Sequence, residues 1–555
     1  MKKILSVFLV SLLISTNIFA LEVDKTELQS TKSTTIEFIS YTGPHKIIDS
    51  VEAIKGIGNS LGKEIAPSRD TSKTANLGNK YTVIHAIDEN ETGKFDADII
   101  FINKNANVDH ITNLRRIISA YLVSAYDYSE ADADTLAVFI TVYNAVYRGD
   151  LDSFKNKYKD VVVKNLSSNN CGLSVNYKDW PGASEIVIPL YDVKNGGLST
   201  IETSVISDKK VVESMKEDDD KNIESRKEMV DIKEREAEES QEKANAAQKK
   251  AVEEQKKLKE EKQKTEEAKA EAKEAEKKSE QAKAEAEEAK KEAEANPEDE
   301  ELQKVAEEKQ EEAEAAEQEA EEKQEEAEAA EQEAEEKQEA LEEQQEAEAA
   351  QEEKTEEAKE EAKTEQERAD KKQTEAQTER KDIAKDQQIV QNNEIKEAST
   401  PSSYGIVLTD EANILSKLVK FNSKTGEVIK SSPVTVIRNR TIYKTPDAYI
   451  AIAGENEGNG TIKLVLIDIE TMEIFAESEE TVSDTSVLVN DGNEYYCVIN
   501  YDDDWVVGKY DETLALKLKS KVNVKQSTPI TVTESGIVVT DKNGNLKLLS
   551  KESLE

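Results

Sequence analysis

The chain has 555 residues, of which 35% are charged and only 5% are aromatic, and its formal net charge is −44. This length carries too little apolar material for one continuous core, so a long solvated segment is expected between smaller globular parts. The negative charge repels phosphate backbones and anionic headgroups, which argues against nucleic-acid binding and against membrane-surface binding by the bulk protein.

Residues 1–20 predict a secretory signal peptide. Lys2 and Lys3 precede an apolar run that reaches Ile14, and small and polar residues follow up to Ala20. The run is too short for a comfortable membrane span, and no Cys lies near the expected cleavage point to carry a lipid. The mature chain is therefore expected to be exported to the periplasm or cell envelope, without an integral membrane span.

Residues 21–208 predict an α+β domain. Runs of β-branched residues between turn signals predict strands at Thr34–Tyr41, Tyr81–Ile87 and Asp96–Ile102. Apolar residues recur every three or four positions over residues 114–122 and 136–146, which predicts two helices. The cysteines Cys171 and Cys497 are too few for a disulfide framework, and both a single bridge and two buried thiols remain open.

The tripeptide Arg148-Gly149-Asp150 lies where the second of these helices is expected to end. Gly149 is well placed as the left-handed residue after a helix, and Asp150 can cap a following helix over residues 151–162. An adhesive tripeptide needs an exposed and mobile loop. The helix junction is therefore the favoured interpretation, and integrin-type adhesion is the alternative for the same three residues.

Residues 209–397 consist almost entirely of Glu, Lys, Gln and Ala and predict one or two very long helices, forming a coiled coil or a helical hairpin. Heptads with position a at Ala251 and Thr265 place Ala247, Ala268 and Ala275 at position d, so the seam is built from small residues rather than leucine.

The sequence of residues 311–324 is repeated unchanged in residues 325–338. The seam of core positions continues through both copies. In each copy, every fourth core position is a lysine, Lys323 or Lys337. Asn296-Pro297, with acidic residues after it, is a start signal for a second helix and marks a break at 296–297. The break leaves two arms of similar length, which favours a folded-back hairpin over a kinked rod.

Residues 398–555 predict an all-β domain of propeller-like repeats. Three similar stretches begin at Lys420, Leu466 and Gly508, each with a strand, a turn that contains a threonine, and another strand. A fourth begins at Leu548. The spacing of roughly 40 to 46 residues is typical of propeller blades, but the segment allows at most four, so closure of a ring stays open.

No reactive constellation is evident, and no catalytic, cofactor-binding or metal-binding residue is expected. None of the histidines His45, His85 and His110 has a second His or a Cys at the sequence spacing of a metal-binding pair. They are expected at the surface or beside helix caps. The stretch GIGNSLG, which begins at Gly56, does not match the glycine motif of dinucleotide-binding proteins. A role in helix packing or in a loop is favoured instead. Arg115 and Arg116 are candidate interaction residues, for which an anion site is the less favoured interpretation.

Two stretches, NLRRIISAYL (113–122) and ITVYNAVYRGDLDSF (140–154), resemble those of the spirochaete 83/100-kilodalton antigen family. The order of signal peptide, N-terminal domain, charged helical middle and distinct C-terminal domain is similar too. The resemblance implies an exported cell-envelope antigen without an enzymatic activity. It supplies no catalytic residues.

The leading hypothesis is an envelope structural or interaction protein in which a helical spacer positions two globular domains. Its partners would be other envelope proteins, or a second copy through the helical segment. A surface adhesin that uses residues 148–150 or the loops of the propeller-like domain is the first alternative. A ligand-binding or hydrolytic N-terminal domain, with Arg115 and Arg116 at its site, is the second.

Overall fold

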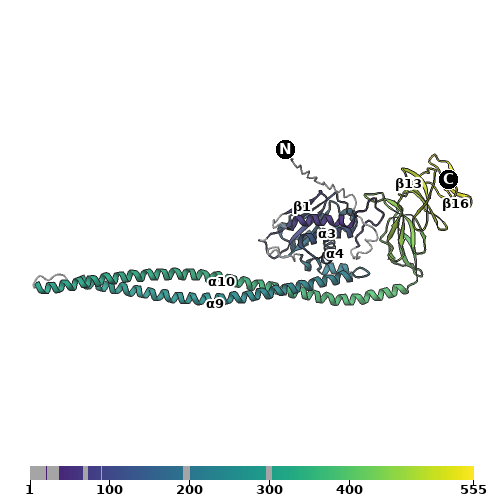
Figure 1. Cartoon of the computed structure of the whole chain (residues 1–555). Helices are drawn as coiled ribbons and strands as arrows, with labels where there is room; N and C mark the ends of the chain where they lie inside the picture. Colours follow the sequence, from purple (N-terminus) through teal and green to yellow (C-terminus); the bar gives the residue numbers. More distant parts are fainter. Residues whose placement is uncertain (1–20, 22–36, 67–72, 89, 192–200, 295–302) are drawn as a thin grey trace, which may run out of the picture. The chain divides into compact units, whose positions relative to one another are not determined.

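The computed structural model describes residues 21, 37–66, 73–88, 90–191, 201–294 and 303–555. They form an α+β region, two long helices and a C-terminal region of antiparallel sheets (Figure 1). The chain divides into two compact units, one of residues 1–232 with 377–555 and one of residues 233–376. The predicted signal peptide and the break at 296–297 lie outside the described residues. No helix in the described ranges is long and apolar enough to cross a membrane.

The N-terminal sheet has four antiparallel strands in chain order. They are β1 (Thr74–Leu77), β2 (Tyr81–Ala86), β3 (Asp96–Ile102) and β4 (Ser184–Leu190). The predictions of β2 and β3 are confirmed, whereas β1 and β4 were not predicted. The strand predicted at 34–41 is wrong for residues 37–41, where only Ile39 forms a bridge, and residues 34–36 lie outside the described residues.

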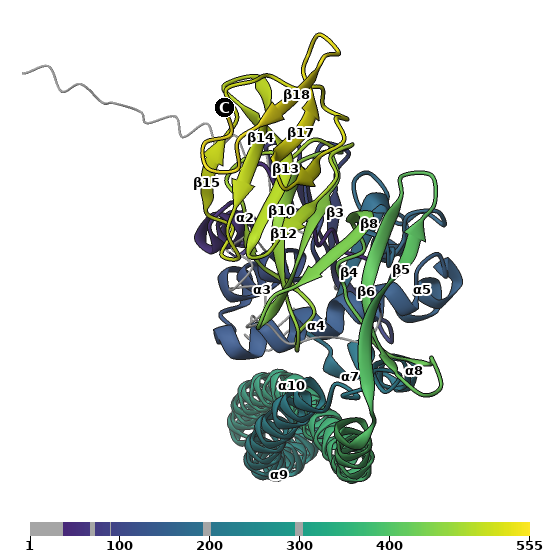
Figure 2. The ribbon, with the colours of Figure 1, turned by 90° about the vertical axis from the view of Figure 1, so that its right-hand side faces the viewer.

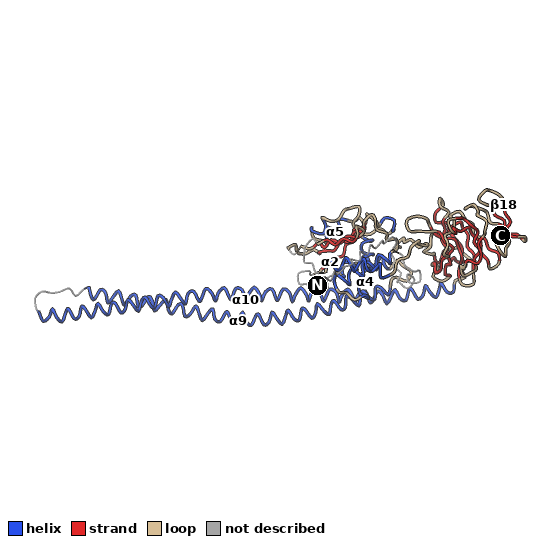
Figure 3. The backbone as a smooth tube through the Cα atoms, turned by 45° about the horizontal axis from the view of Figure 1, so that its top comes forward, coloured by secondary structure: helices blue, strands red, loops and turns tan. Residues whose placement is uncertain are grey.

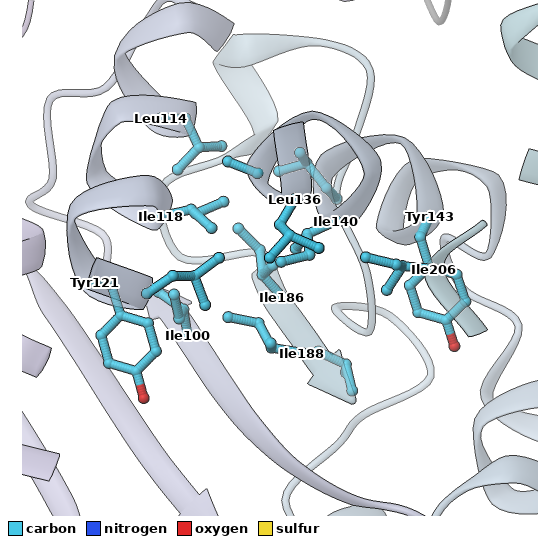
Figure 4. Packing of buried hydrophobic residues seen from close by; sticks show 14 of the residues in the cluster. Ile100, Leu114, Ile118, Tyr121, Leu136, Ile140, Tyr143, Ile186, Ile188 and Ile206 are labelled. Carbon is cyan, nitrogen blue, oxygen red and sulfur yellow. The ribbon is translucent and has the colours of Figure 1, made fainter. Parts of the chain in front are cut away.

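Two predicted helices cover one face of this sheet. They are α3 (Ile111–Tyr126) and α4 (Glu130–Val146), which confirms both predictions. Figure 4 shows their apolar side chains directed toward the isoleucines of β3 and β4, all of them fully buried: Leu114, Ile118, Leu136 and Ile140 against Ile100, Ile186 and Ile188. The apolar residues that recur every three or four positions in α3 and α4 therefore belong to the main core of the α+β region.

Helix α2 (Val51–Ile65) crosses α3 at close range because two of its residues have no side chain. A Cβ atom added at Gly58 would lie 2.0 Å from the Ile117 carbonyl oxygen, and one at Gly62 would lie 2.8 Å from that of Tyr121. These glycines belong to the stretch that begins at Gly56, so the helix-packing interpretation is correct.

Short helices complete the α+β region: α5 (Leu151–Lys157), α6 (Asp160–Val163), η1 (Tyr177–Asp179), α7 (Thr203–Ile206) and α8 (Lys209–Met215). The single helix predicted over residues 151–162 is divided at Tyr158, which is extended and bridges to Phe95. The Tyr158 side chain is fully buried, and its hydroxyl lies 3.0 Å from that of Tyr143. This tertiary anchor overrides the local helical preference.

The helical middle contains two helices, α9 (Ile223–Glu294) and α10 (Gln303–Ser399), which lie side by side in Figures 1 and 3 and are seen end-on in Figure 2. Gln241 bonds to Gln366 at 2.7 Å, and further along α9 Glu254 bonds to Gln351 at 2.5 Å. The partner number falls as the residue number rises, so the helices are antiparallel. The hairpin interpretation is therefore correct.

The predicted seam is confirmed where side chains are described. On α9 it contains Ala247, Ala251, Thr265 and Ala275, all buried. On α10 the core positions continue from Lys337 in alternating steps of four and three residues. The side chains at these positions are buried or half-buried, and they include Leu341, Gln344, Gln351, Thr355 and Ala358. A helix begins at Lys209 as predicted, but it is the short α8. Lys221 and Asn222 adopt positive φ and separate it from α9, so the long helix begins only at Ile223.

The C-terminal region consists of three antiparallel sheets (Figure 2). The first contains β5 (Ser402–Asp410), β6 (Leu415–Asn422), β7 (Val428–Ser431), β8 (Ile437–Lys444), β9 (Ala448–Gly454), β10 (Ile462–Asp468) and β11 (Ile474–Glu477). The second contains β12 (Val489–Asp491), β13 (Glu494–Tyr501), β14 (Asp504–Tyr510) and β15 (Leu516–Lys519), and the third β16 (Thr531–Thr533), β17 (Gly536–Thr540) and β18 (Leu546–Leu549). The all-β prediction is confirmed at this level.

The four predicted repeats share one turn. It follows β6, β10, β14 and β18, and its first residue accepts backbone N–H bonds through its own side chain: Asn422, Asp468, Asp511 and Ser550. Each turn then contains one residue with positive φ, namely Gly426 (77°), Met472 (63°), Leu514 (66°) and Leu554 (55°). The four similar stretches found in the sequence therefore share the same turn conformation in the structure.

A short segment before α2 contacts the C-terminal sheet within the same compact unit. Lys46 donates its N–H to the Asn459 carbonyl at 2.8 Å, and Thr461 donates to the Pro44 carbonyl at 3.1 Å. Tyr41 is buried in a core cluster of this sheet, and its hydroxyl donates to Pro44 at 2.9 Å.

The two cysteines are unbridged and buried. Burial raises the pKa of the Cys171 and Cys497 thiols. Of the two alternatives left open, the pair of buried thiols is correct.

We expect Gly58→Ala to destabilise the α+β region by about 1–3 kcal/mol, because the new methyl group has no room against α3. Gly56→Ala in the same helix is the control, since nothing lies within 4 Å of its added Cβ, and it should stabilise by roughly 0.5–1 kcal/mol. Urea unfolding followed by Trp180 fluorescence in a Trp505→Phe background measures both. Equal effects of the two substitutions would contradict the close crossing.

Candidate interaction sites

The Arg148-Gly149-Asp150 segment is a helix junction. The Arg148 Nη1 donates to the carbonyls of Asn170 at 2.6 Å and Gly172 at 3.0 Å. Gly149 has φ 76°, and Asp150 caps α5 by accepting the Ser153 N–H at 3.0 Å. The arginine is thus held against the protein's own backbone, and the aspartate already has donors. These contacts supply a structural reason for all three residues.

Arg115 and Arg116, the other predicted interaction residues, point to different environments. Arg115 is only 8% exposed and donates through Nε to Thr141 at 3.0 Å, while its Nη2 has no hydrogen-bond partner among the described residues. Burial lowers the pKa of its guanidinium to about 9. Arg116 donates to Asn113 at 3.0 Å. The structure does not join these arginines to the 148–150 segment by any contact among the described residues.

A buried polar cluster between the sheet and α3 was not predicted. His85 of β2 and Asp98 of β3 are directly opposite each other, and His85 Nδ1 lies 2.6 Å from Asp98 Oδ1. The hydroxyls of Tyr121 and Tyr126 both donate to Asp98 Oδ2. Burial, and then the Asp98 charge, raise the pKa of both tyrosines well above the usual range. The Asp98 carboxylate therefore has three hydrogen-bond donors. Because they come from β2 and α3, the cluster links β2 and β3 to α3.

The histidine predictions have mixed outcomes. His110 is the N-cap of α3 and accepts the Thr112 N–H at 3.2 Å, as predicted. The prediction is wrong for His85 and for His45, since both are buried, and His45 Nε2 lies 2.9 Å from Asp109. In each case an aspartate from another segment compensates for burial of the imidazole, and sequence spacing does not reveal that aspartate.

The hairpin base is defined here as Arg226 of α9 with Glu379 and Asp386 of α10. The Arg226 side chain is fully buried, and its guanidinium donates to Glu379 at 2.6 Å and to Asp386 at 2.8 Å. Arg226 follows the first turn of α9, and Asp386 precedes the last turns of α10. The base therefore fixes the beginning of one long helix beside the end of the other.

The hairpin arm, residues 233–376, contains charge pairs of its own in which the lysine is buried. Lys233 pairs with Glu375 at 2.7 Å, and Lys372 pairs with Glu236 at 2.9 Å. Burial lowers the pKa of the Lys233 ammonium although Glu375 opposes the shift. A buried pair contributes little net stability, but a helix in the wrong register would leave each charge unpaired. These pairs therefore specify alignment.

Replacing Asp150 tests the helix-junction assignment. Asp150→Ala should destabilise the α+β region by about 0.5–2 kcal/mol through loss of the cap, whereas Asp150→Asn keeps a capping oxygen and should unfold with nearly the parent free energy. Urea unfolding followed by Trp180 fluorescence measures the difference. An adhesion motif predicts a different pattern in a cell-attachment assay, where Asp150→Asn would abolish attachment as fully as Asp150→Ala.

Reversing one charge of the Lys233–Glu375 pair tests the alignment of the hairpin. Lys233→Glu or Glu375→Lys alone should destabilise the hairpin by about 3 kcal/mol, because a buried charge loses its partner. The double reversal should recover most of that loss. The exposed pair Lys250–Glu361, whose atoms lie 3.8 Å apart, is the matched control and should change stability by less than about 1 kcal/mol. Thermal unfolding followed by circular dichroism distinguishes these outcomes.

Comparison with known proteins supports the resemblance noted from the N-terminal residues. A search of curated proteins found no match. The model of the family described as Borrelia P83/100 protein matches residues 25–530. This range includes the α+β region, both long helices and the first two sheets of the C-terminal region, and the third sheet, β16 to β18, lies beyond it. On this match, the chain belongs to the Borrelia P83/100 protein family.

Proposed function

We propose that this protein is an exported structural or interaction protein of the cell envelope, in which the helical hairpin positions the α+β and all-β modules. The observation that carries the proposal is the hairpin base, where Arg226 bonds to Glu379 and Asp386. Because the chain enters and leaves the hairpin at this point, both flanking modules are attached at the same end. The hairpin therefore joins its modules through two paired helices.

Three further features support this role. The arm is strongly acidic, since each copy of the 14-residue repeat carries seven glutamates and one lysine. Its seam is rich in small and polar residues, so rigidity comes from helix pairing rather than from a large apolar core. The apolar start of residues 1–20 and the family match are consistent with export to the envelope.

The four turn repeats support a finer assignment for the all-β module. We infer that they are blades of an open propeller-type array, because each repeat places its turn and the strand before it in the same geometry. An array of this kind offers strand edges and loops for binding another protein.

Shortening the hairpin tests the proposed function. Deletion of residues 251–264 together with 342–355 removes two heptads from each arm and keeps facing residues matched. The hairpin should stay helical and lose roughly 21 Å of length at 1.5 Å per residue. Chemical cross-linking in cells should then show altered contacts with envelope proteins, while the chain survives protease treatment of intact cells.

Deletion of residues 251–264 alone is the control, because it shifts one arm by two heptads and leaves charge pairs mismatched. That variant should lose thermal stability as well as envelope contacts. If the matched double deletion retains every cross-link of the parent chain, arm length has no role and the positioning proposal is wrong. Degradation of the parent chain on intact cells would instead favour a surface-exposed protein.

A further inference from the structure

Strand β5, the first strand of the C-terminal region, has a neighbouring strand on one side only. Each of β9, β13 and β17 lies between two antiparallel strands, which are β8 and β10, β12 and β14, or β16 and β18. Within the described part of the chain, β5 pairs with β6 alone and is an edge of the first sheet (Figure 2). The position that β8, β12 or β16 occupies in the other repeats is therefore open in the first.

The residues that precede β5 do not supply the missing strand. Helix α10 continues to Ser399, and only Thr400 and Pro401 separate it from β5, which begins at Ser402. In the third and fourth repeats, by contrast, the chain forms β12 or β16 before it enters β13 or β17. The open edge thus results from the direct junction between the long helix and the sheet.

The backbone of Ile406 presents two hydrogen-bonding groups at this edge. Ile406 lies opposite Leu418 of β6, and the Leu418 carbonyl accepts the Ser432 N–H, beyond β7, at 2.8 Å. Ile406 and Leu418 therefore form a pair that exchanges no hydrogen bonds, so the N–H and the C=O of Ile406 both point away from β6. Among the described residues, no hydrogen bond reaches either group.

The equivalent groups in the third repeat are bonded. Val498 and Thr540 are equivalent to Ile406, because each lies opposite the residue four positions before the shared turn. The Val498 N–H donates to Ser486 Oγ at 2.8 Å, and the Val498 carbonyl accepts the Ser483 N–H at 2.9 Å. Both partners belong to the segment that leads into β12.

The fourth repeat has the same arrangement. The Thr540 N–H donates to Thr528 Oγ1 at 2.7 Å, and the Thr540 carbonyl accepts the Lys525 N–H at 3.2 Å. Two residues after the accepting hydroxyl, each segment has a buried apolar side chain, Leu488 or Ile530, and the outer strand begins directly after it. The segments that fit this edge therefore share a hydroxyl residue, any residue, and then an apolar residue.

The edge of β5 is exposed as well as unpaired. Every residue of β9 is buried. In β5, Ser402 and Ser403 are exposed, Val407 is 44% exposed and Leu408 is 47% exposed. An edge strand that exposes apolar side chains is a template for pairing with another strand.

We propose that the edge of β5 binds an extended segment of another protein, in which a serine or threonine is followed two positions later by a branched apolar residue. The hydroxyl accepts the Ile406 N–H, and the residues after the apolar side chain pair antiparallel with Tyr404 and Ser403. The partner is a different protein because the chain's own strands of this kind, β12 and β16, are each held within their own repeats. This docking rests on the interaction role proposed for the all-β module, and addition of a strand to a sheet edge is a common way to bind a peptide.

A labelled peptide with the sequence of residues 525–535, which contains β16, is the probe for the full mature chain. Fluorescence anisotropy should show saturable binding to the parent chain. The change Thr528→Val within the peptide removes the accepting hydroxyl and should weaken binding by about tenfold or more, because the Ile406 N–H is then left without a partner. A peptide with the same residues in scrambled order should not bind.

Proline substitution locates the site on the chain. Ile406→Pro removes the N–H that the peptide uses but no bond to β6, and a strand edge tolerates proline, so affinity should again fall by about tenfold or more. Leu408→Pro is the matched control, because its N–H points the same way. The equivalent N–H of Lys542 bonds to Asn523, which the peptide does not include, so this variant should bind the peptide as the parent does.

Hydrogen exchange followed by mass spectrometry gives a readout that needs no substitution. In the free chain, the fragment that contains β5 should exchange faster than the fragment that contains β17. The peptide should protect the β5 fragment and leave the β17 fragment unchanged. The variant with the matched double deletion in the hairpin should show the same protection, so a failure of the arm-length test is distinguishable from a failure here.

Three results would overturn the proposal. The first is absence of binding to the parent chain, and the second is binding that Ile406→Pro leaves unchanged. The third is a concentration-dependent dimer in sedimentation velocity that the peptide dissociates, because this result would assign the edge to a second copy of the chain.

Discussion

The pairing of α9 with α10 is the interaction that links the α+β region to the C-terminal sheets along the chain. Its seam contains few large apolar side chains, so burial of methylene groups contributes less per heptad than in a leucine seam. Alignment is specified instead by charges that are taken out of water in pairs, such as the fully buried Arg226 with Glu379 and Asp386, and Lys372 with Glu236. A shift in register separates these partners, and a buried charge that loses its partner is strongly destabilising.

Much of the architecture was predictable because its signals are local. Strands β2 and β3, helices α3 and α4, the Gly149 and Asp150 junction and the heptad positions of α9 each depend on residues close together in the sequence. The exceptions depend on distant contacts. Tyr158 interrupts a predicted helix because its ring belongs to the core, and the edge strand β1 contains only four residues.

Strand β4 could have been found from its sequence, since residues 186–190, IVIPL, are a continuous apolar run of the kind that a strand buried on both faces shows. The interaction residues were harder to predict. The imidazole of His85 and the carboxylate of Asp98 are opposite each other only once β2 and β3 are placed in register. The pairing of Arg226 across the hairpin likewise requires knowledge of which residue of α10 it faces, and low-complexity sequence does not provide that.

The turn residues with positive φ have a consequence for how the C-terminal region folds. Only the first turn uses glycine, and the others place Met472, Leu514 and Leu554 in a backbone conformation that costs such residues about 1 kcal/mol or more. All three side chains are buried, each in a different apolar cluster. In each of these three turns, the buried side chain therefore packs as part of an apolar core. A repeat of this kind cannot open without exposing that side chain to water, so the hairpins are expected to unfold cooperatively rather than one at a time.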